Sequence, residues 1–242
     1  MDTKVFLAGA GPGDPELLTV KALRVLERAD VVLYDSLTGP QILSLCRPDA
    51  RLIDVGKRCG GKAMAQAEIS ALLVDEARQN GVVLRLKGGD PMIFGRATEE
   101  MHALRNAGIS FEVIPGITAA AAAAAALHTS LTRREIARSL HFLAAHGADG
   151  GLPPHDWVAL TRTGGTLAVY MGTKTLAKLA ENLIAAGMAP GIPAAAVENV
   201  SLPGQRIFTA GLAALPAVLA QAAPSGPVLL LIGAAVAADE IV

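Results

Sequence analysis

The chain has few aromatic residues, few cysteines and almost no net charge. Aromatic side chains make up 3% of its 242 residues, too few to form a platform on which nucleic-acid bases stack. The net charge of −1 provides no overall basic field that would attract nucleic acid or an anionic membrane. Cys46 and Cys59 form neither a disulfide framework nor a metal-ligand spacing, and the five histidines show no such spacing either. We therefore expect no nucleic-acid partner, no membrane partner and no metal site.

Long hydrophobic runs are also absent. The longest apolar run falls short of the ~20 residues that cross a bilayer. The N-terminus lacks a basic region followed by an apolar stretch, so we expect a cytoplasmic location. Apolar residues nevertheless make up 52% of the chain, which is enough for the core of one large or two small domains.

Positive charge is gathered in local clusters. With so little net charge, these clusters matter more for binding than the charge of the whole chain. They are Lys57, Arg58 and Lys62; Arg85, Lys87 and Arg96; and Arg133, Arg134 and Arg138.

Strand-like and helix-like segments alternate along the whole chain, which predicts an α/β fold. In the first half we expect strands at 5–10, 31–35, 51–58, 82–86 and 111–114, joined by helices into a parallel sheet. In the second half we expect strands at 139–145, 166–170, 193–198 and 227–232, with helices near 174–186 and 211–221. Pro115-Gly116 is a plausible linker, so the predicted domains are 1–114 and 117–242.

The first predicted strand ends in the glycine-rich segment 9–15. Asp14 suits the N-cap of a helix and Pro15 its first position, with Leu18 and Ala29 at the two ends of one buried face. A dinucleotide-binding fingerprint needs a glycine where Asp14 stands, and Pro12 removes a backbone donor that a phosphate would use. The segment therefore fits a neutral or cationic adenosyl ligand better than a phosphate.

Two charged residues follow neighbouring predicted strands. Asp35 ends the strand 31–35, and Lys57 ends the strand 51–58. Ligands of open α/β sheets bind at the carboxyl ends of the strands, so these two side chains are candidates for facing one cleft. The alternative is that both are simply solvated charges at strand ends, and the two residues alone favour that interpretation.

The most informative stretch is Arg85-Leu-Lys-Gly-Gly-Asp-Pro-Met-Ile-Phe-Gly-Arg96. A strand that stops at Gly88-Gly89 lets the backbone approach a ligand closely, because neither residue has a Cβ atom. Asp90 is free to accept a hydrogen bond from a ribose or an amine, or to cap the next turn. The four residues Gly-Gly-Asp-Pro alone fit a tight turn as well as they fit a binding loop.

All twelve residues together resemble the signature of the tetrapyrrole methylase family, and within it the uroporphyrinogen-III C-methyltransferases. The only departure in this stretch is Met92, where the family has Phe. The resemblance implies two α/β domains with the active-site cleft between them, and a homodimer. It also implies S-adenosylmethionine as cofactor, S-adenosylhomocysteine as its product, and a tetrapyrrole as the small-molecule substrate. The implied reaction is methylation of uroporphyrinogen III at C2 and C7 to give precorrin-2, for sirohaem, cobalamin or haem d1. Any dehydrogenase or chelatase step that follows is expected to need other proteins.

The family's motifs also imply roles for individual residues of this sequence. The Tyr-Asp motif makes Asp35 the proton acceptor, and the Gly-Lys motif makes Lys57 the proton donor. Arg96 and Arg134 become partners of substrate carboxylates, since a guanidinium pairs with a carboxylate through two hydrogen bonds. The implied cofactor contacts are Pro12, Gly88, Gly89, Asp90, Ile93, Thr118, Ala119, Met171, Val200 and Pro227.

The sequence departs from the family pattern at several positions. Ser36 replaces an Arg, Arg133 replaces a His, and Val200 replaces a cofactor-contacting Gly, while Gln66 is all that remains of a His-x-x-Pro-Gln segment. Two other interpretations therefore stay open. One is a methylase of the same fold that acts on another substrate, such as a later corrin precursor. The other is a catalytically inactive tetrapyrrole-binding module.

Overall fold

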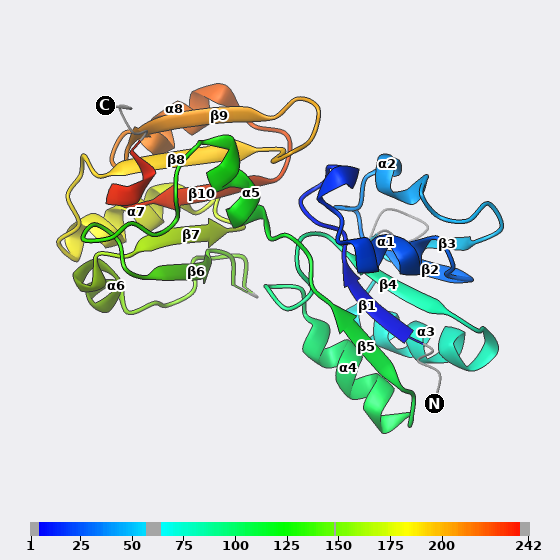
Figure 1. Ribbon diagram of the computed structural model, residues 1–242. Coiled ribbons are helices and arrows are strands. Elements are labelled where there is room, and N and C mark those ends of the chain that lie inside the picture. Colours follow the sequence, from blue (N-terminus) through cyan, green and yellow to red (C-terminus); the bar gives the residue numbers. More distant parts are fainter. Residues whose placement is uncertain (1–4, 57–63, 148, 238–242) are drawn as a thin grey trace. The chain divides into compact units, whose positions relative to one another are not determined.

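The computed structural model describes residues 5–56, 64–147 and 149–237. The chain divides into two compact units, residues 1–118 and 119–242, and each is an α/β layer structure in itself (Figure 1). The fold class expected from the alternation of strands and helices is confirmed.

The first unit is built on a five-stranded parallel sheet with the strand order β3-β2-β4-β1-β5. Strand β4, which carries the start of the signature stretch, therefore pairs with β1 on one side and β2 on the other. The strands are β1 (Val5–Gly9), β2 (Val31–Tyr34), β3 (Arg51–Asp54), β4 (Val83–Lys87) and β5 (Phe111–Ile114).

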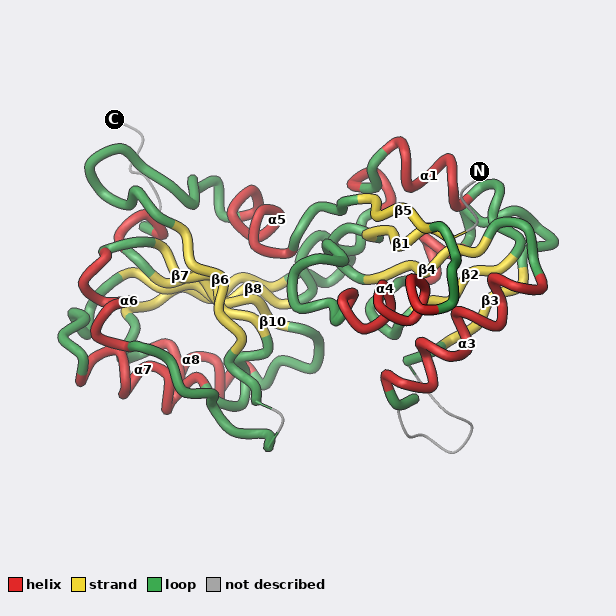
Figure 2. Tube along the Cα trace, turned by 90° about the horizontal axis from the view of Figure 1, so that it is seen from below, coloured by secondary structure: helices red, strands yellow, loops and turns green. Residues whose placement is uncertain are grey.

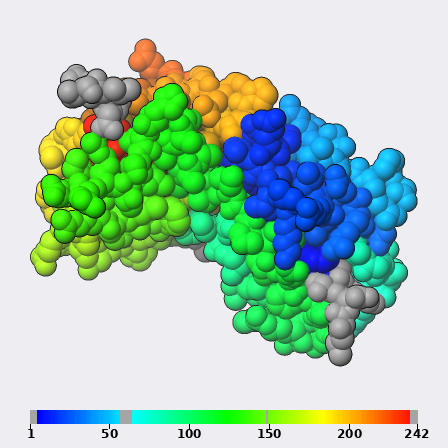
Figure 3. Space-filling model, viewed as in Figure 1, coloured from blue at the N-terminus to red at the C-terminus, as the bar shows by residue number. Residues whose placement is uncertain are grey.

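Helices cover both faces of this sheet, as Figure 2 shows. Alternate side chains of the strands separate into two apolar clusters, because successive residues of a strand point to opposite faces. Val83 packs on the face covered by α3 (Gln66–Gln79) and α4 (Ala97–Asn106). Leu84 and Leu86 pack on the other face, with α1 (Val20–Leu26) and α2 (Pro40–Leu43). The space-filling view shows α1 and the loop before it, in blue, on the surface of this unit (Figure 3).

The second unit has a mixed five-stranded sheet with the order β6-β7-β10-β8-β9. Strands β6 and β7 are parallel, and the other pairs are antiparallel. The strands are β6 (Leu140–Ala144), β7 (Thr166–Tyr170), β8 (Pro193–Glu198), β9 (Arg206–Gly211) and β10 (Val228–Ile232), and the helices are α5 (Ala119–Ala126), α6 (Trp157–Thr163), α7 (Leu176–Ala185) and α8 (Leu215–Ala222). Helices α7 and α8 bury their apolar faces against one side of the sheet, and α5 lies on the other side (Figure 2).

Three expectations about the elements are wrong. The helix expected from Asp14 begins later: Asp14 caps a short 3-10 helix, Pro15–Leu17, and α1 starts after Thr19, whose hydroxyl accepts the Ala22 amide. The helix expected from 211 starts at Leu215, because Gly211 still pairs with Pro193 at the end of β9. Strand β9 and helix α6 were not predicted at all.

No helix among the described residues is long and apolar enough to cross a membrane. Nor do three or more His, Cys, Asp or Glu side chains of the described part gather where they could hold a metal ion.

Candidate active site

The loops that follow the five strands of the first unit meet at one edge of its sheet. This follows from the topology, since the carboxyl ends of parallel strands lie at the same edge, where ligands of α/β proteins bind. The loop after β1 contains Pro12, which is half-buried, and the loop after β2 begins with Asp35. Between them the loop after β4 provides Gly88, Gly89 and Asp90.

Three glycines let three backbone segments cross at this edge. A Cβ atom on Gly9 would lie 2.4 Å from the carbonyl oxygen of Gly89, and one on Gly116 would lie 2.2 Å from the same oxygen. Gly89 itself has φ +67°, and its amide donates to the Gly11 carbonyl at 2.7 Å. Any larger residue at position 9 or 116 would therefore displace the loop that carries Asp90.

The Asp90 carboxylate is tied to the backbone on both sides. Its Oδ1 accepts the Met92 amide at 2.8 Å, and its Oδ2 accepts the Gly116 amide at 3.0 Å. The capping role considered for Asp90 is thus present, and each oxygen keeps a further lone pair for a ligand. The predicted linker at Gly116 is thus held against the loop between β4 and α4, residues 88–96, which we call the signature loop.

The rest of the signature loop has an unusual backbone. Phe94 and Arg96 have φ angles of 51° and 53°, a region that residues other than glycine seldom adopt. Such conformations persist where the surrounding structure requires them, often at binding sites. Ile93 is half-buried, and its amide closes a turn on the carbonyl of Asp90. The exposed Arg96 side chain pairs with Glu99.

Asp35 is bonded directly to this loop. Its Oδ2 accepts the Gly88 amide at 3.3 Å, and its Oδ1 accepts the Leu37 amide at 3.1 Å. The Nη2 atom of Arg85 lies 3.9 Å from Oδ2. The structure therefore brings the predicted proton acceptor to the glycine pair that is predicted to contact the cofactor. Its predicted partner Lys57 lies outside the described residues.

Of the predicted local cluster Arg85, Lys87 and Arg96, the structure leaves Arg96 exposed and buries the other two. Arg85 and Lys87 are two positions apart on β4, so both point to the face covered by α3 and α4, and both are buried. There they meet Glu100 of α4, whose carboxylate accepts Arg85 Nε at 2.9 Å and Lys87 Nζ at 3.0 Å. Gln66 of α3 donates to the same carboxylate at 3.2 Å. Burial, and then the nearby charge of Arg85, lowers the pKa of Lys87.

The ion pairs of Arg85 and Lys87 with Glu100 determine which charges lie at the carboxyl edge of the first sheet. The two buried cations are occupied by Glu100, and Arg96 is occupied by Glu99, whereas the carboxylates of Asp35 and Asp90 stay at the edge, half-buried. Among the described residues, the edge thus offers carboxylates, carbonyls and glycine backbone. These groups suit a cationic sulfonium ligand such as S-adenosylmethionine and do not suit a phosphate.

The second unit has its own group of predicted residues at one edge. Strands β7 and β8 both run antiparallel to β10, so their carboxyl ends lie beside its amino end. Met171 follows β7, Val200 comes just after β8, and Pro227 precedes β10. The Asn199 amide donates to the Pro227 carbonyl at 3.0 Å, which joins two of these segments directly.

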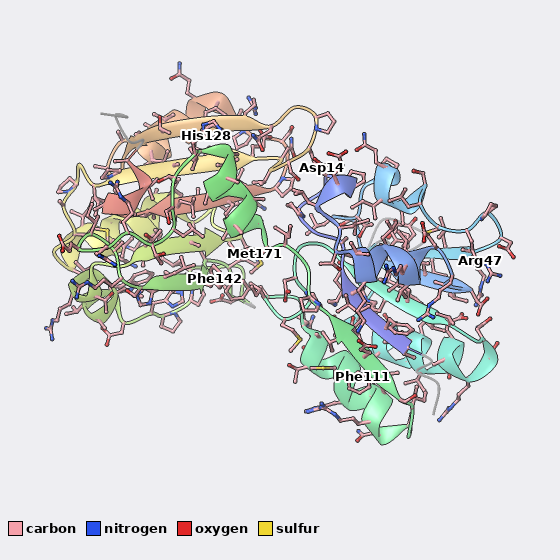
Figure 4. All side chains as sticks on the ribbon, viewed as in Figure 1. Asp14, Arg47, Phe111, His128, Phe142 and Met171 are labelled. Atoms are coloured by element: carbon pink, nitrogen blue, oxygen red, sulfur yellow. The ribbon has the colours of Figure 1, made fainter. Side chains whose placement is uncertain are left out.

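Backbone geometry explains how valine stands at position 200. Positive φ angles occur on either side of it, at Asn199 (50°) and Ser201 (62°), and not at Val200 itself. A β-branched residue is therefore tolerated there without strain. Met171 has a φ of 58° and is 49% exposed, so the chain turns sharply there and leaves the side chain open to solvent (Figure 4).

A buried carboxylate fixes this edge as well. Glu198, the last residue of β8, is 1% exposed and accepts the amides of Ser225 and Gly226 at 2.7 and 2.8 Å. Its other oxygen accepts Arg206 Nε at 2.6 Å. The Arg206 guanidinium, together with the two amides, holds the pKa of Glu198 below its usual range. The segment before Pro227 is thereby held in place.

The start of α5 lies close to Met171. The hydroxyl of Tyr170 accepts the Ala120 amide at 3.3 Å, which brings Ala119 beside the end of β7. Thr118, the last residue of the first unit, is half-buried. The predicted substrate partner Arg134 is exposed in the turn between Arg133 and Ala137, and no described contact joins it to the other predicted residues.

A family profile described as "Tetrapyrrole (Corrin/Porphyrin) Methylases" matches residues 4–216 of the sequence. The chain belongs to the tetrapyrrole methylase family. Membership confirms the resemblance drawn from the signature stretch, and with it the predicted class of enzyme.

Solved structures of tetrapyrrole methylases are similar over nearly the whole chain. The uroporphyrin-III C-methyl transferase of Thermus thermophilus, complexed with S-adenyl homocysteine, is 39% identical with a TM-score of 0.81. The alignment covers 96% of this chain and 98% of that one. A cobalt precorrin-4 methyltransferase has a TM-score of 0.87 at 29% identity, with 96% and 95% of the two chains covered. The Thermus complex and the family agree with S-adenosylmethionine as the predicted methyl donor.

Curated relatives that match the chain are longer than it is. The siroheme synthase of Chromobacterium violaceum is 48% identical over 229 residues, which are 95% of this chain and 48% of that protein. The chain thus spans about half the length of the curated relatives that it matches.

Sequence reasoning missed Glu100 and Glu198. A signal for Glu100 was available: Arg85 and Lys87 alternate with leucines on a strand in the middle of a sheet, so an acid in a covering helix has to meet their charge. Glu198 gave no comparable signal, because two of its three donors are backbone amides.

Proposed function

We propose that the chain transfers methyl groups from S-adenosylmethionine to C2 and C7 of uroporphyrinogen III and so forms precorrin-2. The observation that carries this proposal is the Asp35 carboxylate bonded to the Gly88 amide of the signature loop. Support comes from the 39% identity with the Thermus uroporphyrin-III methyltransferase and the 48% identity with a siroheme synthase. The product serves the formation of sirohaem, cobalamin or haem d1.

The residues proposed to contact the cofactor come from both units. In the first unit they are Pro12, Gly88, Gly89, Asp90, Ile93 and Thr118; in the second they are Ala119, Met171, Val200 and Pro227. S-adenosylmethionine, when bound, supplies an electrophilic methyl group on a positively charged sulfur. The half-buried carboxylate of Asp90 favours that charge. The glycine backbone permits close approach, and Asp90 is a hydrogen-bond acceptor for a ribose.

Most of the catalysis in this proposal consists of orienting the substrate and excluding water. The nucleophile is an electron-rich pyrrole carbon of the substrate, so the enzyme needs no nucleophile of its own. After methyl transfer a proton must leave the macrocycle, and the ionised carboxylate of Asp35 accepts it. Lys57 remains the proposed proton donor. Arg96 and Arg134, both exposed, are the proposed partners of substrate carboxylates.

The test is an anaerobic incubation with S-adenosylmethionine labelled in its methyl group and uroporphyrinogen III, followed by mass analysis of the macrocycle. Two methyl groups on the ring are expected. If no label enters the ring while calorimetry shows that the cofactor binds, the substrate assignment is wrong. An inactive tetrapyrrole-binding module would bind the porphyrinogen and transfer no methyl group even in a single turnover.

A second candidate is methylation of a later corrin precursor. The TM-score of 0.87 with a cobalt precorrin-4 methyltransferase favours it. The higher sequence identity with the Thermus enzyme speaks for uroporphyrinogen III. Assaying both substrates side by side with the same labelled cofactor decides between them.

Three further parts of the proposal rest on the family and the sequence. We propose a cytoplasmic location, a homodimer, and domains that span residues 1–114 and 117–242. Sedimentation equilibrium tests the dimer, since a mass near twice 24.8 kDa is expected. Limited proteolysis tests the boundary, with first cleavage expected between residues 114 and 117.

A further inference from the structure

One buried carboxylate in the first unit has no role in the proposed chemistry. Glu100 is 0% exposed, and the backbone geometry of β4 and α4 places it under the signature loop. Its two oxygens accept Arg85 Nε at 2.9 Å, Lys87 Nζ at 3.0 Å and Gln66 Nε2 at 3.2 Å. All of these donors are side chains, and two of them are cations.

Arg85 connects Glu100 to the proposed proton acceptor. One side of its guanidinium is held by Glu100, and Nη1 donates to the carbonyl oxygens of Leu33 at 3.3 Å and Leu86 at 2.8 Å. With these bonds in place, Nη2 lies 3.9 Å from Asp35 Oδ2. The same Oδ2 accepts the Gly88 amide at 3.3 Å. A continuous line of contacts thus runs from Glu100 through Arg85 and Asp35 to the signature loop.

The charges along this line balance only when Asp35 is counted. Arg85 and Lys87 bring two positive charges, and Glu100 brings one negative charge, so one positive charge is in surplus. A buried charge without a partner is costly, and the carboxylate of Asp35 lies within ion-pair distance of Arg85, at 3.9 Å. The ionised form of Asp35, which can accept a proton, completes the balance.

We propose that Glu100 is a positioning residue: it holds Arg85 and Lys87 so that their surplus positive charge keeps the ionised Asp35 carboxylate against the Gly88 amide. The inference rests on the proposed function in assigning proton acceptance to Asp35. The geometric part, the hold on the Gly88 amide, does not need any substrate.

The first unit provides a matched control in Glu76. This residue is also a buried glutamate, 6% exposed, and it pairs with Arg51 and with Asn80. Arg51 begins β3 and Asn80 comes just before β4, so this pair lies at the amino end of the sheet, away from the carboxyl edge. Glu76→Gln therefore disturbs the ion pair of a buried glutamate in the same unit, here with an exposed arginine, without touching the line to Asp35.

The first measurement is hydrogen exchange of the Gly88 and Leu37 amides by NMR, with the full chain and no substrate. Glu100→Gln leaves Arg85 and Lys87 with Asp35 as their one counter-charge and without the carboxylate that holds them, so it is expected to lower the protection of both amides by about 10-fold or more. Glu76→Gln is expected to leave them within about twofold of the parent chain. Unchanged protection in Glu100→Gln would overturn the inference, whatever the substrate proves to be.

The second measurement is the single-turnover rate of methyl transfer to uroporphyrinogen III at saturating cofactor, scaled to the protein that binds S-adenosylhomocysteine. Glu100→Gln is expected to lower this rate by about 10-fold with KM nearly unchanged, because it disturbs the geometry of Asp35 and not the binding of substrate. Glu76→Gln is expected to stay within about twofold. An equal rate for the two variants would assign Glu100 a purely structural role.

A charge-balance series keeps the test valid if Glu100→Gln folds poorly. Lys87→Met leaves the Arg85–Glu100 pair intact and removes the surplus charge, so it is expected to lower the rate and the Gly88 protection by itself. Lys87→Met combined with Glu100→Gln leaves Arg85, among the described residues, as the one cation paired with Asp35 and is expected to recover both. A double variant worse than both singles would overturn the charge balance.

Failure of the proposed function is recognised separately. If the parent chain transfers no methyl to uroporphyrinogen III, the proposed function is wrong, and the exchange of the Gly88 amide still decides whether Glu100 positions Asp35.

Discussion

Each unit buries one glutamate beside the carboxyl end of a strand, and the two are compensated in different ways. Glu100 is completely buried, and two of its three side-chain partners are buried cations. Glu198 is 1% exposed, but its partners are two backbone amides and Arg206, whose side chain is 44% exposed. Glu100 thus neutralises buried charge, and Glu198 holds the segment before Pro227 through its backbone amides.

The difference indicates how the two edges divide the work. In the first unit the ionisable groups are coupled, so a change at Glu100 affects the charge and position of Asp35. In the second unit Glu198 orders the segment before Pro227, and the nearby predicted contacts, Met171 and Val200, carry no charge. We therefore expect substitutions at Asp35 and the charged residues coupled to it to change the rate of methyl transfer, and substitutions at Glu198 to change cofactor affinity.

The largest effect is expected from Glu100→Ala. Glu100 bonds both buried cations directly, so removing its carboxylate should lower the free energy of unfolding of the first unit by about 3–5 kcal/mol. Hydrogen exchange of the β1 and β4 amides measures this locally. Loss below about 1 kcal/mol would mean that water reaches Arg85 and Lys87, and the contrast with Glu198 would then disappear.

Asp35→Asn should act on the rate and leave binding unchanged. The amide cannot accept the proton, so single-turnover methyl transfer should fall by about 10²-fold, equivalent to about 2.7 kcal/mol, with cofactor affinity nearly kept. Rapid-quench assays and calorimetry measure the two quantities. An unchanged rate would remove Asp35 from the chemistry and leave the first unit without its proposed reactive group.

Glu198→Ala should have a smaller effect on stability than Glu100→Ala. Two backbone amides lose their acceptor, while Arg206 can turn to water, so the expected loss is about 1–3 kcal/mol. Cofactor affinity should fall as the segment before Pro227 loosens. Exchange of the Ser225 and Gly226 amides and calorimetry measure these effects, and a lower methyl-transfer rate at full cofactor saturation would contradict the division of work.

The contribution of Glu198 should also depend on pH. Its pKa is lowered in the folded chain, so its stabilising effect is present above its unfolded pKa of about 4.3 and is lost as the pH falls through the folded value. The stability difference between the parent chain and Glu198→Gln should therefore shrink on acidification below about pH 4.3. Urea titrations at several acidic pH values, read by exchange in the second unit, provide the measurement. If this stability difference instead grows toward acid, folding raises the pKa of Glu198 and the prediction is wrong.

The smallest effect is expected from Arg206→Ala. Because Arg206 is half-exposed and Glu198 keeps both amides, the loss should be about 0–1 kcal/mol and should fall further in high salt. The corresponding substitution in the first unit is Arg85→Ala. It should lower the free energy of unfolding several times more, because Glu100 has side-chain donors where Glu198 keeps two backbone amides. Equal losses at the two arginines would show that both carboxylates depend on their cations to the same degree.

The sequence predicted the first unit better than the second. Apolar strands that end in glycine or an acid, such as the segment before Gly88, identify parallel strands and their carboxyl edge directly. The mixed direction of the second sheet comes from β10, which runs antiparallel to both β7 and β8. The missed strand β9 is an edge strand whose side chains are half-buried or exposed, so it lacks a continuous apolar pattern. The Pro203-Gly204 turn between β8 and β9 was a signal for this antiparallel pair.

For the candidate site, the sequence named residues but not their partners. Asp35 and Gly88 were both predicted, while the hydrogen bond between them depends on β2 lying beside β4 in the sheet. Arg85 and Lys87 were predicted as part of a cationic cluster, and only the packing of α4 on β4 shows that Glu100 compensates them. Long-range pairing of this kind is set by tertiary structure, which local patterns do not encode.

The crossing of Gly9, Gly89 and Gly116 has a consequence for how the protein is made. The signature loop is closed by contacts with the first strand and with the residue that follows the fifth, which come from opposite ends of the first unit. Contacts so far apart in sequence form late in folding. A ribosome-bound chain that has not yet released Gly116 should therefore have most of the parallel sheet without a closed loop. The closed signature loop would then arise in a single late step in the synthesis of the first unit, once the last of the three glycines has emerged.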